Sequence, residues 1–187
     1  MGVVDDFKGA SILCKVAFIL LLIATLFTCI SYTTADWVYE DVGNTHYGLW
    51  RICGETDIPT GCQTIDGFAN DWYGVVQAFV TFGFFGILVS FFLVILYIFV
   101  SKCQKNGEVA IAVAIICIAT GVFYLIGVII FGAKVDKWPE NVTIDYKLGY
   151  SFALSIVALV LEIVAGVLMI VEGKGGGGGG GGTKPSA

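Results

Sequence analysis

Four long apolar segments limit what this chain can fold into more than any motif it contains. They cover about residues 10–32, 74–100, 109–132 and 150–171. Each can cross a hydrocarbon core of about 30 Å, which takes roughly 20 helical residues at a rise of 1.5 Å per residue. Of the 187 residues, 57% are hydrophobic and 13% charged, and the mean hydropathy of +0.89 excludes a soluble globular domain. We therefore predict an all-α membrane bundle with four transmembrane helices and both termini on one side.

The same pattern predicts a single membrane domain over residues 1–172 and a flexible tail over residues 173–187. The tail contains an unbroken run of glycines over residues 175–182, which is typical either of a native flexible segment or of an added linker. At the other end, the apolar stretch from Ile12 to Ile30 exceeds the roughly 7 to 15 residues of a signal-peptide core. This length favours an uncleaved first helix after a short stub over residues 1–9.

Three features agree on the orientation in the membrane. Six of the ten lysines and arginines lie in or beside the terminal segments and the short 101–108 loop, which the positive-inside rule places in the cytosol. The 35–72 loop contains Cys53 and Cys62, and a bridge between them needs an oxidising compartment. The 133–148 loop contains a glycosylation sequon at Asn141, so close to both flanking helices that its occupancy stays open. We expect a multi-pass plasma-membrane protein with cytosolic termini and these two loops outside.

The 35–72 loop is expected to form a small extracellular antiparallel β-sheet. Short aromatic and β-branched segments alternate there with turn residues. A bridge between Cys53 and Cys62 would stabilise so small a unit by roughly 2–3 kcal/mol on the chain-entropy model. A redox role is disfavoured because the pair lacks the Cys-x-x-Cys spacing. A metal site is also disfavoured, because two cysteines and the single histidine, His46, fall short of the usual four ligands.

The same loop is strongly acidic. One basic residue, Arg51, opposes seven acidic ones: Asp36, Glu40, Asp41, Glu55, Asp57, Asp66 and Asp71. The first five of these are candidates for a field that concentrates cations at a pore or a partner surface. The alternative is an ordinary solvated face, and the sequence alone favours that alternative.

Two further candidates lie outside the loops that we place extracellularly. Glu162 is the one ionisable residue deep in an apolar segment. We expect it to make a structural contact, through a protonated carboxyl bonded to Thr120 or Ser90, because a proton relay would need a chain of titratable partners. Cys103, between Lys102 and Lys105, is a candidate palmitoylation site or an ordinary free thiol.

One ordered set of residues in the first outer loop resembles the signature of the claudin superfamily. It consists of Trp37, then Gly48-Leu49-Trp50, Cys53 and Cys62. Two more segments, 76–79 and 145–152, look more like the branch of the peripheral myelin, epithelial membrane and lens fibre membrane proteins. The resemblance covers about residues 10–172. It implies a left-handed four-helix bundle with a small sheet from both outer loops, bridged cysteines, and Trp37 and Gly48-Leu49-Trp50 holding the sheet against the helices.

Two departures from typical claudins bear on function: Gln77 stands where they place an arginine, and the scaffold-binding ending of many claudins is not found. Two function classes follow. One is a protein of cell–cell contacts or a paracellular barrier, which associates with itself or related tetraspan proteins in one membrane and across the gap. The other is an organiser or auxiliary subunit of other membrane proteins. We expect no enzyme activity, no cofactor and no nucleic-acid partner, because no nucleophile–base pair, cofactor motif or metal set is found.

Overall fold

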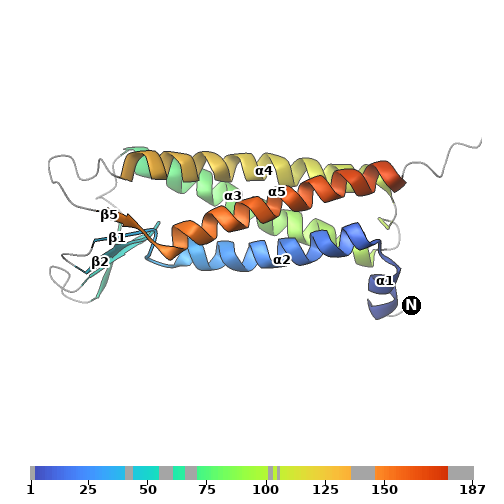
Figure 1. The fold of residues 1–187 in the computed structure, drawn as a ribbon, viewed down its shortest axis with the longest axis horizontal. Coiled ribbons are helices and arrows are strands. Elements are labelled where there is room, and N and C mark those ends of the chain that lie inside the picture. The colour runs from blue at the N-terminus through green and yellow to red at the C-terminus, as the bar shows by residue number, and fades with distance from the viewer. Residues whose placement is uncertain are drawn as a thin grey trace, which may run out of the picture.

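The structure is a computed structural model that describes residues 3–40, 44–54, 61–65, 71–100, 103–104, 106–135 and 146–176. Four long helices lie side by side, and a small sheet covers one end of the bundle (Figure 1). The helices are α2 (Ile12–Thr33), α3 (Asp71–Phe99), α4 (Gly107–Lys134) and α5 (Tyr150–Gly176). All four are long and apolar enough to cross a membrane, which confirms the predicted tetraspan bundle.

Both ends of the chain are more helical than the sequence indicated. Helix α1 (Val3–Gly9) occupies the segment that we expected to be a stub, and Phe7 packs edge-on against Phe18 of α2 at 6.0 Å between ring centroids. Helix α5 continues past Val171 into the predicted tail. It can do so because Gly173 lets α5 approach α4 closely: a Cβ there would lie 2.7 Å from Ile111 Cγ1. Residues 177–187 lie outside the described ranges.

The sheet has five short antiparallel strands in the order β4-β3-β2-β1-β5, which confirms the predicted small sheet. Both outer loops contribute strands: β1 (Val38–Glu40), β2 (Thr45–Tyr47), β3 (Arg51–Cys53) and β4 (Cys62–Thr64) from the first, and β5 (Tyr146–Leu148) from the second. Strand β5 pairs with β1, with Val38 opposite Leu148. The sheet therefore ties residues that are more than a hundred positions apart.

Glycines allow α3 and α4 to pack closely. A Cβ on Gly83 of α3 would lie 2.6 Å from the Cβ of Tyr124 on α4, and a Cβ on Gly127 of α4 would lie 2.8 Å from Val80 Cγ2 on α3. Each glycine thus receives a side chain of the other helix. In lipid, where apolar tails surround the helices, such close van der Waals contact is a main source of helix association.

Replacing Gly83 by alanine should therefore destabilise the bundle by about 1–3 kcal/mol, because the new methyl group overlaps Tyr124. The matched control is Gly74→Ala on the same helix, where a Cβ meets nothing within 4 Å, and alanine is the better helix former. Unfolding of the purified variants in mixed micelles measures both effects. Equal stability of the two variants would contradict the close α3–α4 contact.

Candidate functional site

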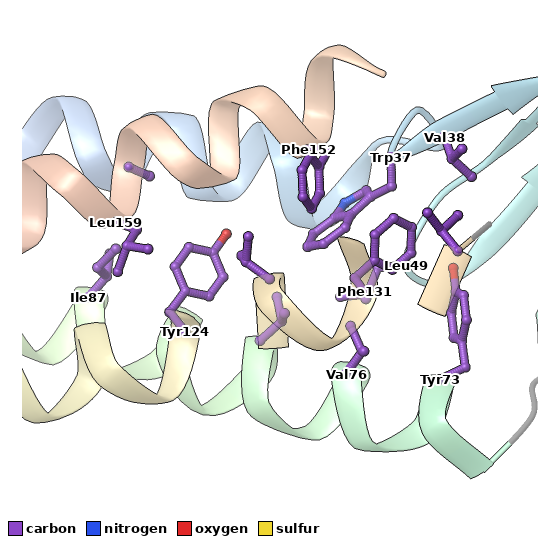
Figure 2. Close-up of a cluster of buried hydrophobic side chains, with 14 of the residues drawn as sticks. Trp37, Val38, Leu49, Tyr73, Val76, Ile87, Tyr124, Phe131, Phe152 and Leu159 are labelled. Carbon is purple, nitrogen blue, oxygen red and sulfur yellow. The ribbon is translucent and has the colours of Figure 1, made fainter. Parts of the chain in front are cut away.

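Trp37 lies where the chain leaves α2 and enters the sheet, and it is fully buried. Its ring packs edge-on against Phe131 of α4 and Phe152 of α5, at 5.0 and 5.9 Å between centroids (Figure 2). Its indole Nε1 donates a 2.8 Å hydrogen bond to the carbonyl of Ser31 in the last turn of α2. A buried indole needs such an acceptor, and a carbonyl at a helix end needs a donor. The hydrogen bond between Trp37 and Ser31 satisfies both groups.

The backbone of Trp37 belongs to the sheet and to the start of α5. Its N–H donates to the carbonyl of Tyr47 at 2.9 Å, and its carbonyl accepts from the N–H of Gly149, also at 2.9 Å. The ring of Trp37 therefore lies in the bundle while its peptide groups lie in the sheet. Sheet and helices cannot separate without exposing this side chain.

The turn at Gly48 and Leu49 is bonded to the first turns of α3. The hydroxyl of Tyr73 donates to the Gly48 carbonyl, and Gln77 Nε2 donates to the Leu49 carbonyl at 2.8 Å. Gly48 also lies against the end of α2, since a Cβ there would be 2.5 Å from the Cα of Ala35. Only glycine fits this position. Leu49 is fully buried beside it.

Trp50 packs on the side of the turn that faces α2 and α3. Its ring lies 5.6 Å from that of Tyr32 on α2, and Tyr32 stacks in turn on Phe84 of α3 at 4.5 Å. The hydroxyls of Tyr32 and Thr81 are 3.0 Å apart. Trp37, Gly48, Leu49 and Trp50 thus contact the outer ends of all four long helices.

Asp36 is turned inward, in contrast to the outward acidic field suggested by the sequence. Its Oδ1 lies 2.6 Å from Nδ1 of His46 on β2, and its Oδ2 accepts from the N–H of Tyr150 at 3.0 Å. Its side chain is only 13% exposed. The carboxylate therefore caps the start of α5, where it also meets the positive end of the helix dipole. Asp36 joins the sheet to α5 and is not a free surface charge.

The other acidic candidates are placed only in part. Glu40 on β1 is half-buried, whereas Asp41, Glu55 and Asp57 lie outside the described residues, as does the sequon residue Asn141.

The cysteine candidates differ in state. Cys53 and Cys62 face each other across β3 and β4 and are joined by a disulfide. Cys103 is a half-buried free thiol in the turn after α3. Within the described ranges no three His, Cys, Asp or Glu side chains gather as a metal site would require.

Glu162 is completely buried in the middle of α5. Its Oε1 accepts a 2.6 Å hydrogen bond from Thr120 on α4. Beside it, Gly121 of α4 lies close to α5, since a Cβ there would be 3.0 Å from Ile163 Cγ1. The contact joins two helices inside the membrane, where a lone carboxylate would be costly.

The sequence did not identify the α3 residues that bind the Gly48-Leu49-Trp50 segment. Gln77 stands out in the sequence only as a departure from the claudin pattern, and Tyr73 does not stand out, yet both donate to backbone carbonyls of the Gly48-Leu49 turn. A polar side chain in the first turns of an apolar helix indicates that it has a hydrogen-bond partner, and both residues fit this pattern. Their acceptors could not be named, because the turn is remote in sequence.

Asp36→Asn should destabilise the protein by about 1–3 kcal/mol, because a neutral amide replaces the charge-assisted hydrogen bonds of the carboxylate and loses its attraction to the positive end of the α5 dipole. Hydrogen exchange at the Tyr150 amide should accelerate as well. Glu40→Gln on the nearby strand β1 is the matched control, since Glu40 makes no side-chain hydrogen bond to the described residues. Equal stability of the two variants would mean that Asp36 acts only as a surface charge.

Removing the disulfide should cost roughly 2–3 kcal/mol, from the entropy of the loop it closes. Because either mutation breaks the same bond, Cys53→Ser, Cys62→Ser and the double variant should fail to mature equally in cells. Surface biotinylation of the three variants checks this. Normal trafficking of only one single variant would show that the bridge is dispensable for maturation.

Residues 10–169 match the model of the PMP-22/EMP/MP20/Claudin family. The match includes all four long helices up to Met169 and both loops that contribute strands. It therefore contains the joint between sheet and bundle, by which we mean Trp37, Gly48, Leu49 and Trp50 and their contacts with the helices. This chain is a member of the PMP-22/EMP/MP20/Claudin family.

Proposed function

We propose that this tetraspan membrane protein acts at cell–cell contacts, without enzymatic activity. The observation that carries the proposal is the rigid attachment of a disulfide-closed sheet to the bundle, through Trp37 and the Gly48-Leu49 turn. A preorganised surface loses little freedom when it binds, so it favours association with a second membrane. The strand β4 at one edge of the sheet is exposed over its whole length, as are Lys147 and Leu148 at the other edge.

The proposed orientation places the sheet outside the cell and both termini in the cytosol. The disulfide supports this, because such bonds persist in oxidising compartments and are rare in the cytosol. The sheet and the end of α5 lie at opposite ends of the bundle (Figure 1). We place the protein in the plasma membrane, with the lipid bilayer and other tetraspan proteins, including copies of itself, as its partners.

A cation preference is the finer part of the proposal. Since Asp36 is bound to His46 and to Tyr150, the field would come from Glu40, Asp41, Glu55 and Asp57. Four carboxylates on a small loop raise the local concentration of cations within a Debye length, about 8 Å at physiological salt. Such a loop lining a gap between cells favours passage of sodium over chloride.

The alternative function is a lateral organiser of other membrane proteins, and one surface of α3 supports it. Phe82, Phe85 and Phe92 are 63, 58 and 57% exposed. Their spacing of three and seven residues places them along one face of the helix. This ridge offers a transmembrane partner an aromatic surface without any contact between cells.

The two functions predict different results when expressing and non-expressing cells are grown together, in a cell line that lacks junction strands. If the protein joins cells, labelled protein should concentrate only at borders between two expressing cells, and a confluent layer should gain sodium over chloride permeability. Replacing Glu40, Asp41, Glu55 and Asp57 by their amides should remove that preference by abolishing the field, while border enrichment remains. The matched charge control, with Asp5, Asp6 and Glu108 neutralised at the other end of the bundle, should leave both readouts unchanged.

Uniform surface staining with unaltered permeability would contradict the contact function and favour the organiser. Border enrichment with an unchanged sodium preference in the amide variant would refute only the charge argument.

A further inference from the structure

A small cavity, lined mostly by apolar atoms with one carboxylate at its wall, lies at the end of the bundle opposite the sheet. It has a volume of about 130 Å³ and is lined by Gly9, Ala10, Ser11, Tyr97, Gln104 and Glu172. The first three lie at the junction of α1 and α2, Tyr97 in the last turn of α3, Gln104 in the turn that follows α3, and Glu172 near the end of α5. This is the end of the bundle that carries α1 in Figure 1. We propose that this cavity binds the ammonium group of an ethanolamine phospholipid.

Glu172 supplies the charge for this site. Its Oε2 accepts a 2.6 Å hydrogen bond from Ser11 Oγ, and its Oε1 accepts from the Tyr97 hydroxyl at 3.4 Å. No lysine, arginine or histidine among the described residues forms an ion pair with it. The two hydroxyls thus fix the direction of the carboxylate at the cavity wall, and neither of them carries a positive charge.

The walls of the cavity are held by packing, so the site exists before a ligand arrives. Helix α1 is held against the bundle by a row of rings, since Phe7 packs on Phe18 and Phe18 packs on Phe91 at 5.5 Å. Beside Glu172, Gly173 lies directly on Ile111 of α4. A preformed site of this kind avoids much of the ordering cost of binding.

The lining selects a primary ammonium group over a quaternary one. A primary ammonium has three N–H donors, and three of the lining side chains carry acceptor oxygens: the Glu172 carboxylate and the Ser11 and Tyr97 hydroxyls. The Gln104 amide donates through Nε2 to the Ile98 carbonyl. A choline group has no N–H donor and is recognised mainly by cages of aromatic rings. Tyr97 is the single ring among the six lining residues. The chemistry therefore favours ethanolamine over choline.

The position of the cavity favours a lipid over a free amine. Ile12, the first residue of the apolar span of α2, is 78% exposed, so the adjacent Ser11 lies at the depth where headgroups begin. Lys15 follows Ser11 by one helical turn on the same face. Its Nζ bonds to the Lys8 carbonyl at 2.9 Å. This cation lies one turn from Ser11, where a headgroup phosphate next to the ammonium group can meet it.

The test uses the full-length protein in detergent micelles, with native mass spectrometry to count bound lipid. Phosphatidylethanolamine should bind with at least about tenfold higher affinity than phosphatidylcholine of the same acyl chains. Glu172→Gln should lose about tenfold in this affinity, because a charge-assisted hydrogen bond becomes a neutral one. Glu108→Gln, an exposed carboxylate near the same end of the bundle, should bind as the parent does. Thermal unfolding of both variants without added lipid shows whether they remain folded.

The source of the ammonium group is tested with free ethanolamine and with Lys15→Gln. If the ligand is a lipid, millimolar ethanolamine should not displace it, and Lys15→Gln should weaken lipid binding through loss of the phosphate contact. Equal affinity for the two phospholipids, or unchanged binding in a folded Glu172→Gln variant, would overturn the proposal. Displacement by free ethanolamine would overturn the assignment to a lipid.

Discussion

The hydrogen bond from the Trp37 indole to the Ser31 carbonyl lies at the point where the chain passes from the membrane-spanning helix α2 to the sheet. At this depth a helix must end, and its last carbonyls lose their intrahelical donors in surroundings that offer little water. The indole supplies a donor and fills the space between α4 and α5 with its ring. The backbone of the same residue is hydrogen-bonded to Tyr47 and to Gly149. Trp37 therefore fixes the positions of three elements relative to one another: the end of α2, the sheet and the start of α5.

The position of the sheet depends on this joint, since five strands of three residues each are too short to be stable alone. The disulfide limits the freedom of β3 and β4, and β5 reaches the sheet because it leads directly into α5. The backbone carbonyls of Gly48 and Leu49 are bound by side chains of α3. The sheet is thus an extension of the helix bundle, and its rigidity is that of the bundle.

The four helices were predictable because the requirement for about 20 apolar residues is strict in a bilayer. The existence of a small sheet was also predictable, from turn residues and β-branched segments. The resemblance implied that both loops contribute to the sheet. The particular pairing of β5 with β1 was not predictable, since it joins remote loops and depends on where α2 and α5 end. The inward position of Asp36 was missed for the same reason: composition records its charge, whereas its partners His46 and Tyr150 are brought together only by the fold. Short helix α1 was missed because seven residues give almost no periodicity.

Three carboxylates at three depths determine how α5 is placed along its axis. Asp36 accepts from the first backbone N–H of α5, Glu162 binds Thr120 in the middle, and Glu172 binds Ser11 near the other end. Apolar contacts alone would fix this position weakly, because lipid tails are as apolar as the leucine and valine side chains they replace. Hydrogen bonds are directional, and a shift of one residue moves the helix by about 1.5 Å, which is enough to break all three. The rarity of polar groups in this chain is therefore what lets each of them specify the register of a helix.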